Sequence, residues 1–237
     1  MALNLDRGIA LRLRLQQDMI LEYRCFTQVT QEFSNAGNLL GKKEHAWDTR
    51  VRQRVIRQEG DISHILTISE PIGDVPQEPI MGSQVMRQVM YAQINACGNV
   101  LEAVGGINSL SYAFPEENVT AGCSWEKETQ VILPGMPYPA PSTNTFTLIG
   151  EERVGGYDCV RIDMKSSAAQ FEMVLPAGQQ KANVVSETSG SIFYAPEKGL
   201  LVRLEINTRS IPKIEGFAFN TISKMAQDLV SCEVRKS

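Results

Sequence analysis

Two stretches of the chain, residues 146–164 and 190–206, each read as strand, glycine-containing turn and strand. After the turn, apolar and polar side chains alternate strictly in both stretches. The apolar sets are Val160, Ile162 and Met164 in the first stretch and Val202, Leu204 and Ile206 in the second. Successive side chains of a strand point to opposite faces of its sheet, so each set is predicted to line a buried face. Both stretches therefore predict antiparallel hairpins.

Further segments extend this pattern over most of the chain. We expect hairpins from 9–15 with 19–33, from 47–58 with 61–69, and from 90–96 with 100–104. The prolines of 134–141 argue against a central strand there. Segment 217–234 is interpreted as a strand, although its spacing also permits a helix. The predicted fold class is mainly β: a curved antiparallel sheet, half-barrel or open barrel, with little helix. We expect one domain over 1–237, with 71–81 as its candidate internal boundary.

Composition and the chain start limit the classes of partner and location. The net charge of −4 argues against a nucleic-acid binder, which usually presents a basic face. No run approaches 18 apolar residues, so no transmembrane segment is predicted. The first residues do not form a basic-then-apolar leader. As the chain stands we expect a cytoplasmic protein, or a protein of the cell envelope or exterior if a leader has been removed.

The cysteines and histidines do not predict a disulfide framework or a metal site. The five cysteines are widely scattered, no Cys-x-x-Cys pair occurs, and the chain has two histidines. We expect small buried or half-buried thiols and no cofactor or metal. One disulfide stays open if the protein is exported.

Three local patterns are candidate sites. Arg50, Arg52 and Arg54 would share one strand face, and such a stripe either binds phosphate or pairs with acidic residues of neighbouring strands. The second interpretation is favoured because the chain is acidic. Residues 45–48 (His-Ala-Trp-Asp) and 123–125 (Cys-Ser-Trp) each hold one catalytic residue type, but neither marks a nucleophile and a base together. We therefore expect no enzyme.

Several short motifs together resemble a bacterial family of unassigned function whose members are usually exported or lipid-anchored. They are the opening strand pair through Tyr23, 94–100 (Ile-Asn-Ala-Cys-Gly-Asn-Val), 114–125, 156–162 (Gly-Tyr-Asp-Cys-Val-Arg-Ile) and 194–200 (Tyr-Ala-Pro-Glu-Lys-Gly-Leu). The order of hairpins is also similar to lipoprotein-carrier half-barrels of the LolA and LppX type. This second likeness implies an open cup that shelters acyl chains, by analogy of fold alone.

Two non-enzymatic functions follow as expectations. The first is a binding protein that holds an apolar small molecule or lipid on the curved sheet. Its expected ligand-binding residues are Val160, Ile162, Met164, Val202, Leu204 and Ile206. The second is a structural or assembly subunit that joins a protein partner, or a second copy, through sheet edges or an apolar surface such as the one around Met81, Met86 and Met90.

Overall fold

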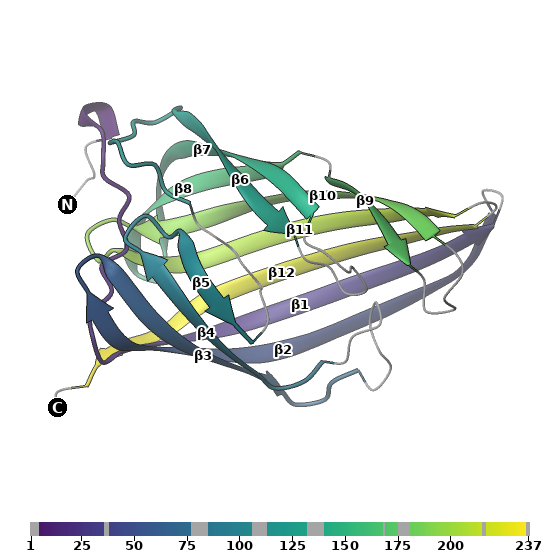
Figure 1. Ribbon diagram of the computed structural model, residues 1–237, viewed down its shortest axis with the longest axis horizontal. Helices are drawn as coiled ribbons and strands as arrows, with labels where there is room; N and C mark the ends of the chain where they lie inside the picture. The colour runs from purple at the N-terminus through teal and green to yellow at the C-terminus, as the bar shows by residue number, and fades with distance from the viewer. Residues whose placement is uncertain are drawn as a thin grey trace.

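The computed structural model describes residues 5–35, 38–76, 85–105, 113–131, 140–167, 169–174, 181–214 and 217–235. Twelve strands form one antiparallel sheet that curls into an open half-barrel (Figure 1). The described chain begins and finishes at one end of this sheet, here called the terminal end. The end at which β1 and β2 turn is called the far end. The predicted fold class is confirmed, and the helix found among the described residues is the short 3₁₀ segment η1 (Leu5–Arg7).

The strand order is β5-β4-β3-β2-β1-β12-β11-β10-β8-β7-β6, and β9 pairs with β10 beside this path. The strands are β1 (Met19–Asn35), β2 (Asn38–Glu59), β3 (Ile62–Ile72), β4 (Gln88–Asn95), β5 (Val100–Val104), β6 (Ser124–Val131), β7 (Ala140–Val154), β8 (Tyr157–Ser166), β9 (Ala169–Val174), β10 (Lys181–Ala195), β11 (Leu200–Ile214) and β12 (Phe217–Val234). Strands that follow one another in sequence mostly pair, which is the meander that the hairpin patterns predicted.

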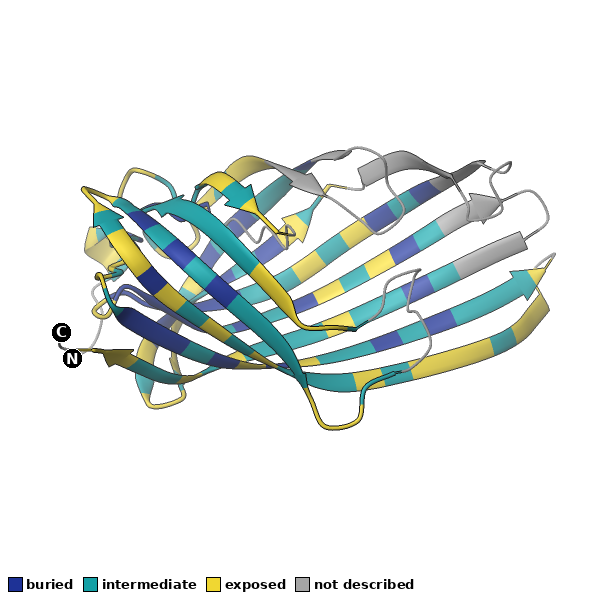
Figure 2. Cartoon of the chain, turned by 60° about the horizontal axis from the view of Figure 1, so that its bottom comes forward, coloured by how far each residue is buried: buried dark blue, intermediate teal, exposed yellow. Residues whose placement is uncertain are grey.

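One face of the sheet carries the main hydrophobic core. Buried side chains occupy alternate positions along the strands (Figure 2). Val55 of β2 and Phe146 of β7 belong to the same core cluster although five strands lie between β2 and β7 in the sheet order. Strands so far apart can share a cluster only on the inner side of a curved sheet. This face is therefore the concave face, and the core fills it near the terminal end.

Six pairings shift register by one extra residue, a β-bulge, and every extra residue is apolar. They are Leu40, Ile56, Leu101, Ile149, Val202 and Val230. All but Val202 are exposed. A bulge bends its strand and increases the local twist, so these positions help the sheet to curl. A bulge also breaks the period-two alternation, which places the extra side chain on a face that the sequence pattern does not predict.

Residues 8–16, the N-terminal strap, do not form the hairpin arm that we expected for 9–15. The strap crosses the terminal end and bonds to separate turns: Leu13 N–H donates to the Ala96 carbonyl (2.7 Å), and Arg14 N–H donates to the Gly199 carbonyl (3.0 Å). Its leucines still follow the predicted alternation, and Leu11 is fully buried in the core. Tertiary bonds replace strand pairing here because the strap must span two distant edges of the curled sheet.

The other hairpin predictions agree with the structure. Segments 47–58 with 61–69, 90–96 with 100–104, 146–164 and 190–206 are all antiparallel pairs, and 217–234 is a strand. The candidate boundary 71–81 lies partly outside the described residues, and β3 and β4 on either side of it pair in one sheet. The proline-rich segment 134–141 lies mostly outside them as well.

Candidate functional site

The six residues expected to bind a ligand do not form one free surface. Five of them, Val160, Ile162, Met164, Leu204 and Ile206, are buried in the main core on the concave face. The side chains of Leu11, Phe114 and Phe146 pack in the same cluster. At the terminal end the concave face is therefore a filled core.

Val202 differs from the other five and corrects the expectation that all six line one face. It packs with Cys159, Phe193 and Ala195 in a second cluster on the convex side. The cause is the β10–β11 bulge: Phe193 pairs with Arg203 and Tyr194 pairs with Leu201, so Val202 is the extra residue. The alternation read from Val202 through Ile206 is therefore broken after its first position.

At the margin of the core, the concave face carries a row of five paired residues, here called the apolar row. In strand order from β10 to β2 they are Gly190, Ile206, Met225, Thr27 and Trp47. Ile206 is buried, and Met225, Thr27 and Trp47 keep part of their surface open. Neighbouring strands lie about 4.8 Å apart, so the row extends roughly 19 Å across the sheet. It is a shallow floor of aliphatic and aromatic surface next to the filled core.

The next two rows toward the far end are polar, and together we call them the polar band. The first row is Thr188, Thr208, Ser223, Val29 and His45, and the second is Ser186, Ser210, Thr221, Gln31 and Lys43. Nine of these ten side chains are polar, and directly paired residues share a face. Polar residues on the inner side of a sheet are unusual because their burial is unfavourable unless they are hydrogen-bonded.

Hydrogen bonds satisfy part of the polar band. Ser186 Oγ and Ser210 Oγ lie 2.9 Å apart, and Thr188 Oγ1 and Thr208 Oγ1 lie 3.2 Å apart. Thr221 is only 2% exposed, and its Oγ1 has no hydrogen-bond partner among the described residues. In the first row, the threonines, Ser223 and His45 are half-buried, whereas the neutral residues of the second row are buried.

The convex face carries the arginine stripe, and two of its three members form ion pairs with acidic residues of other segments. Arg50 pairs with Glu70 of β3 (3.0 Å), and Arg54 pairs with Asp18, just before β1 (2.8 Å). Arg57, beyond the stripe, pairs with Glu59 of its own strand. The hydrogen bond from Arg50 holds the pKa of the Glu70 carboxyl below its usual value. These cations are engaged in exposed ion pairs, which is what an acidic sheet surface favours.

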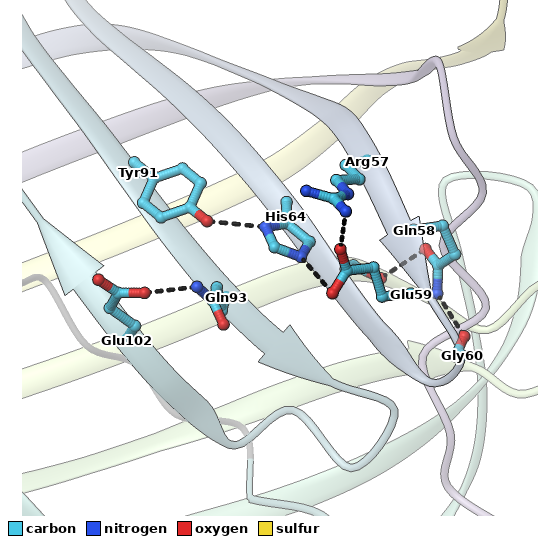
Figure 3. A network of polar contacts seen from close by, with 9 residues as sticks. Arg57, Gln58, Glu59, Gly60, His64, Tyr91, Gln93 and Glu102 are labelled. Atoms are coloured by element: carbon cyan, nitrogen blue, oxygen red, sulfur yellow. Dashed lines mark hydrogen bonds and ion pairs between the residues drawn. The ribbon is translucent and has the colours of Figure 1, made fainter.

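A polar network surrounds His64 near the β2–β3 turn (Figure 3). His64 Nδ1 lies 2.7 Å from the Tyr91 hydroxyl, and His64 Nε2 lies 3.6 Å from Glu59, a contact too long for a hydrogen bond. Glu59 also pairs with Arg57. Among the described side chains, no serine or cysteine joins His64, so this network orients an imidazole without supplying a hydrolase-type nucleophile.

The two weaker catalytic patterns do not assemble either. His45 lies on the concave face, whereas Asp48 lies on the convex face and bonds Arg24 (2.9 Å). In the second pattern, residues 123–125, the hydrogen bond between Thr120 and the Cys123 thiol lowers the pKa of that thiol. The neighbouring Trp125 is engaged in structure, because its indole N–H donates to the Ala113 carbonyl (2.9 Å).

The five cysteines are free, and Cys123 is exposed rather than buried or half-buried as expected. Cys25, Cys97 and Cys159 are buried, and burial raises the pKa of the Cys159 thiol to about 11. In the part of the chain that the structure describes, no cluster of His, Cys, Asp and Glu is suited to a metal ion. No helix among these residues is long and apolar enough to cross a membrane.

A shallow hollow of about 250 Å³ lies on the convex face. Phe26, Gln28, Glu205, Asn207, Lys224 and Ala226 line it together with parts of Ile206 and Met225. Phe26 is 46% exposed at its wall. The hollow is broad and mixed in polarity, so it does not define a ligand class.

Sequence reasoning missed the apolar row, apart from Ile206, and the whole polar band. Their members come from five strands, and no strand contributes more than two of the serines and threonines of the band. The signal that could have found them is the coincidence of Ser186, Thr188, Thr208 and Ser210 at alternate positions of two successive strands. Only the pairing register shows that this coincidence continues into β12, β1 and β2.

No protein-family model and no curated protein matches the chain. Among solved structures, it is similar to a protein of Bacteroides fragilis with a YmcC-like fold that is inferred to be exported: identity is 12% over 94% of this chain and 99% of that one, with a TM-score of 0.35. The attachment invasion locus protein Ail of Yersinia pestis, in complex with the heparin analogue sucrose octasulfate, is 7% identical over 90% of this chain and 99% of its own, with a TM-score of 0.24. Values this low assign neither a family nor a function, and the likeness to lipoprotein carriers stays an expectation.

Proposed function

We propose that this protein is a non-enzymatic binding protein that holds an apolar small molecule or lipid on the concave face of its sheet. The apolar row is the observation that carries the proposal. It offers aliphatic and aromatic surface that the core does not cover completely, on the inner side of a curved sheet where a ligand is enclosed from several directions. Its width of roughly 19 Å suits an alkyl chain lying across the strands.

Binding of an alkyl chain can be measured with octaethylene glycol monododecyl ether below its critical micelle concentration. The chain has two tryptophans, and Trp47 lies in the apolar row. We expect saturable quenching or a blue shift of Trp47 fluorescence, absent in Trp47→Phe, and a 1:1 complex in native mass spectrometry.

Two lysine variants, one in the apolar row and one on the convex face, test where the ligand binds. Met225→Lys puts an ammonium group among apolar contacts and should abolish binding. Ala226→Lys, one residue further on the convex face, should leave it unchanged. The proposal fails if no saturable complex forms, or if both variants bind as the wild type does.

A second candidate function is assembly through the β5 edge. Among the described residues β5 pairs with β4 alone, so one side of its backbone is open to another strand. Beside this edge the convex face carries Val104 and Val89, which are 60% and 50% exposed, and Tyr91 pairs with Val104. If a second copy or a partner docks here, Val104→Lys should convert an oligomer seen by size-exclusion chromatography with light scattering into a monomer. A monomer for the wild type at high concentration would exclude self-assembly.

A further inference from the structure

We propose that the polar band is a binding site for a hydroxyl-rich, uncharged head group, so that the natural ligand is an amphipathic molecule of the glycolipid type. This inference rests on the proposed function, because the head group is placed next to the apolar row that would hold the tail. The two surfaces adjoin without a break: on β11, Ile206 of the apolar row is followed on the same face by Thr208 and Ser210.

The chemistry of the band matches hydroxyl groups. A serine or threonine hydroxyl donates one hydrogen bond and accepts others, and a glutamine amide does both with separate atoms. The band supplies six such hydroxyls and the Gln31 amide on paired strands. Its two rows lie about 7 Å apart along the strands, which is close to the separation of hydroxyl groups on opposite sides of a sugar ring.

The charges of the band do not favour an anionic head group. Lys43, its one permanent cation, stands at the edge of the band on β2 and is exposed. The centre of the band on β11, β12 and β1 consists of neutral groups. A phosphate or carboxylate normally calls for converging cations or several charge-assisted bonds, and the centre has no charged side chain.

Thr221 gives an independent indication that the band is incomplete without a ligand. Thr221 is 2% exposed at the centre of the second row, between Ser210 and Gln31, and its buried hydroxyl lacks a partner in the described part of the chain. A buried polar group without a hydrogen bond is unfavourable. A head-group hydroxyl that reaches this position can both accept from and donate to Thr221 Oγ1, whereas an ether oxygen can accept but not donate.

The test compares three probes that share a dodecyl tail: dodecyl maltoside, octaethylene glycol monododecyl ether and dodecyl phosphate, all below their critical micelle concentrations. We expect wild-type protein to bind dodecyl maltoside at least tenfold more tightly than the other two. Thr221→Val preserves the shape of the side chain and removes Oγ1. It should weaken maltoside binding about three- to tenfold, the usual range for one hydrogen bond, and leave the ether probe unaffected. Thr30→Val, on the convex face of β1, is the matched control and should change neither.

The outcomes separate the two proposals. Equal binding of all three probes, or a preference for the phosphate, overturns the head-group site while the apolar row remains a tail site. The same conclusion follows if Thr221→Val binds maltoside as the wild type does. Failure of every probe to bind overturns the proposed function and this inference together. Thermal unfolding of each variant shows that the fold is retained, and Thr221→Val should be at least as stable as the wild type because it removes an unpartnered hydroxyl.

Discussion

Removal of the Tyr194 hydroxyl should weaken the attachment of the N-terminal strap to the terminal end of the sheet. Tyr194 is fully buried in β10, and its ring contacts Phe114 at a centroid distance of 4.9 Å. Its hydroxyl accepts a hydrogen bond from Arg12 N–H (3.1 Å) and donates one to the Arg12 carbonyl. Tyr194→Phe keeps the ring contacts and leaves both backbone groups of Arg12 without their partner.

The magnitude follows from these two bonds. A lost hydrogen bond that strands a buried polar group costs about 1–3 kcal/mol. Arg12 is half-buried, so water partly replaces the hydroxyl. We therefore expect the free energy of unfolding to fall by about 2 kcal/mol at pH 7. Urea denaturation followed by tryptophan fluorescence measures this, and the midpoint should shift with an unchanged slope. Tyr157→Phe, at the β7–β8 turn, is the control and should stay within about 0.5 kcal/mol of the wild type.

The same hydroxyl predicts a pH dependence. Burial raises the pKa of Tyr194 from 10.0 to about 12. Its stabilising contribution is thus fully present below about pH 10 and is lost as the pH rises through 12, a total of about 2–3 kcal/mol. Tyr194→Phe cannot titrate here, so its stability deficit relative to the wild type should shrink between pH 10 and 12. A deficit below 0.5 kcal/mol at pH 7, or one that stays constant up to pH 12, would refute the reasoning.

Three further predictions test other parts of the fold. Gly199→Ala should lower the free energy of unfolding by about 3 kcal/mol in a thermal or urea assay. The positive φ of 67° at Gly199 disfavours a side chain, and the added Cβ would clash with Arg14 of the strap. Gly60→Ala, with a similar φ of 61° and open space, should lose only about 1–2 kcal/mol, and equal losses would contradict the clash. Ile162→Ala should cost about 2–5 kcal/mol if the terminal end is a filled core, whereas a loss below 1 kcal/mol would indicate a ligand cavity there. Iodoacetamide at pH 8 should alkylate exposed Cys123, whose pKa is lowered, well before buried Cys159, whose pKa is about 11. Mass spectrometry of the digested protein gives the order of labelling, and early labelling of Cys159 would contradict its burial.

Local patterns predicted the strands well where pairing is regular. Alternation in β8 gave both the strand and the buried face of Val160, Ile162 and Met164 correctly. The same reasoning failed at Val202, because this residue is the extra residue of a bulge and faces the convex side, whereas Leu204 faces the concave side. Nothing local marks that bulge, since an apolar residue fits either face of an alternating strand.

The strap shows a second limit of local reasoning. The alternation in 9–15 correctly indicated that its leucines face the interior, yet the segment bonds to residues near 96, 119, 194 and 199 rather than to the strand that follows it. A hairpin and a strap that crosses the sheet bury the same side chains. The choice depends on the curvature of the whole sheet, which separates the edges that the strap must bridge.

The sequence by itself determined that the chain forms meandering antiparallel sheet, because period-two alternation and glycine turns act within a few residues. It also determined that Val160, Ile162 and Met164 line a buried face. Only the tertiary structure decided that the leucine-rich start of the chain and the predicted ligand residues are mostly a filled core. It alone brought together the apolar row and the polar band, whose members lie up to 198 residues apart (Thr27 and Met225 are direct neighbours). The physical reason is that strand register and bulges are fixed by contacts between distant segments, whereas alternation is fixed within each strand.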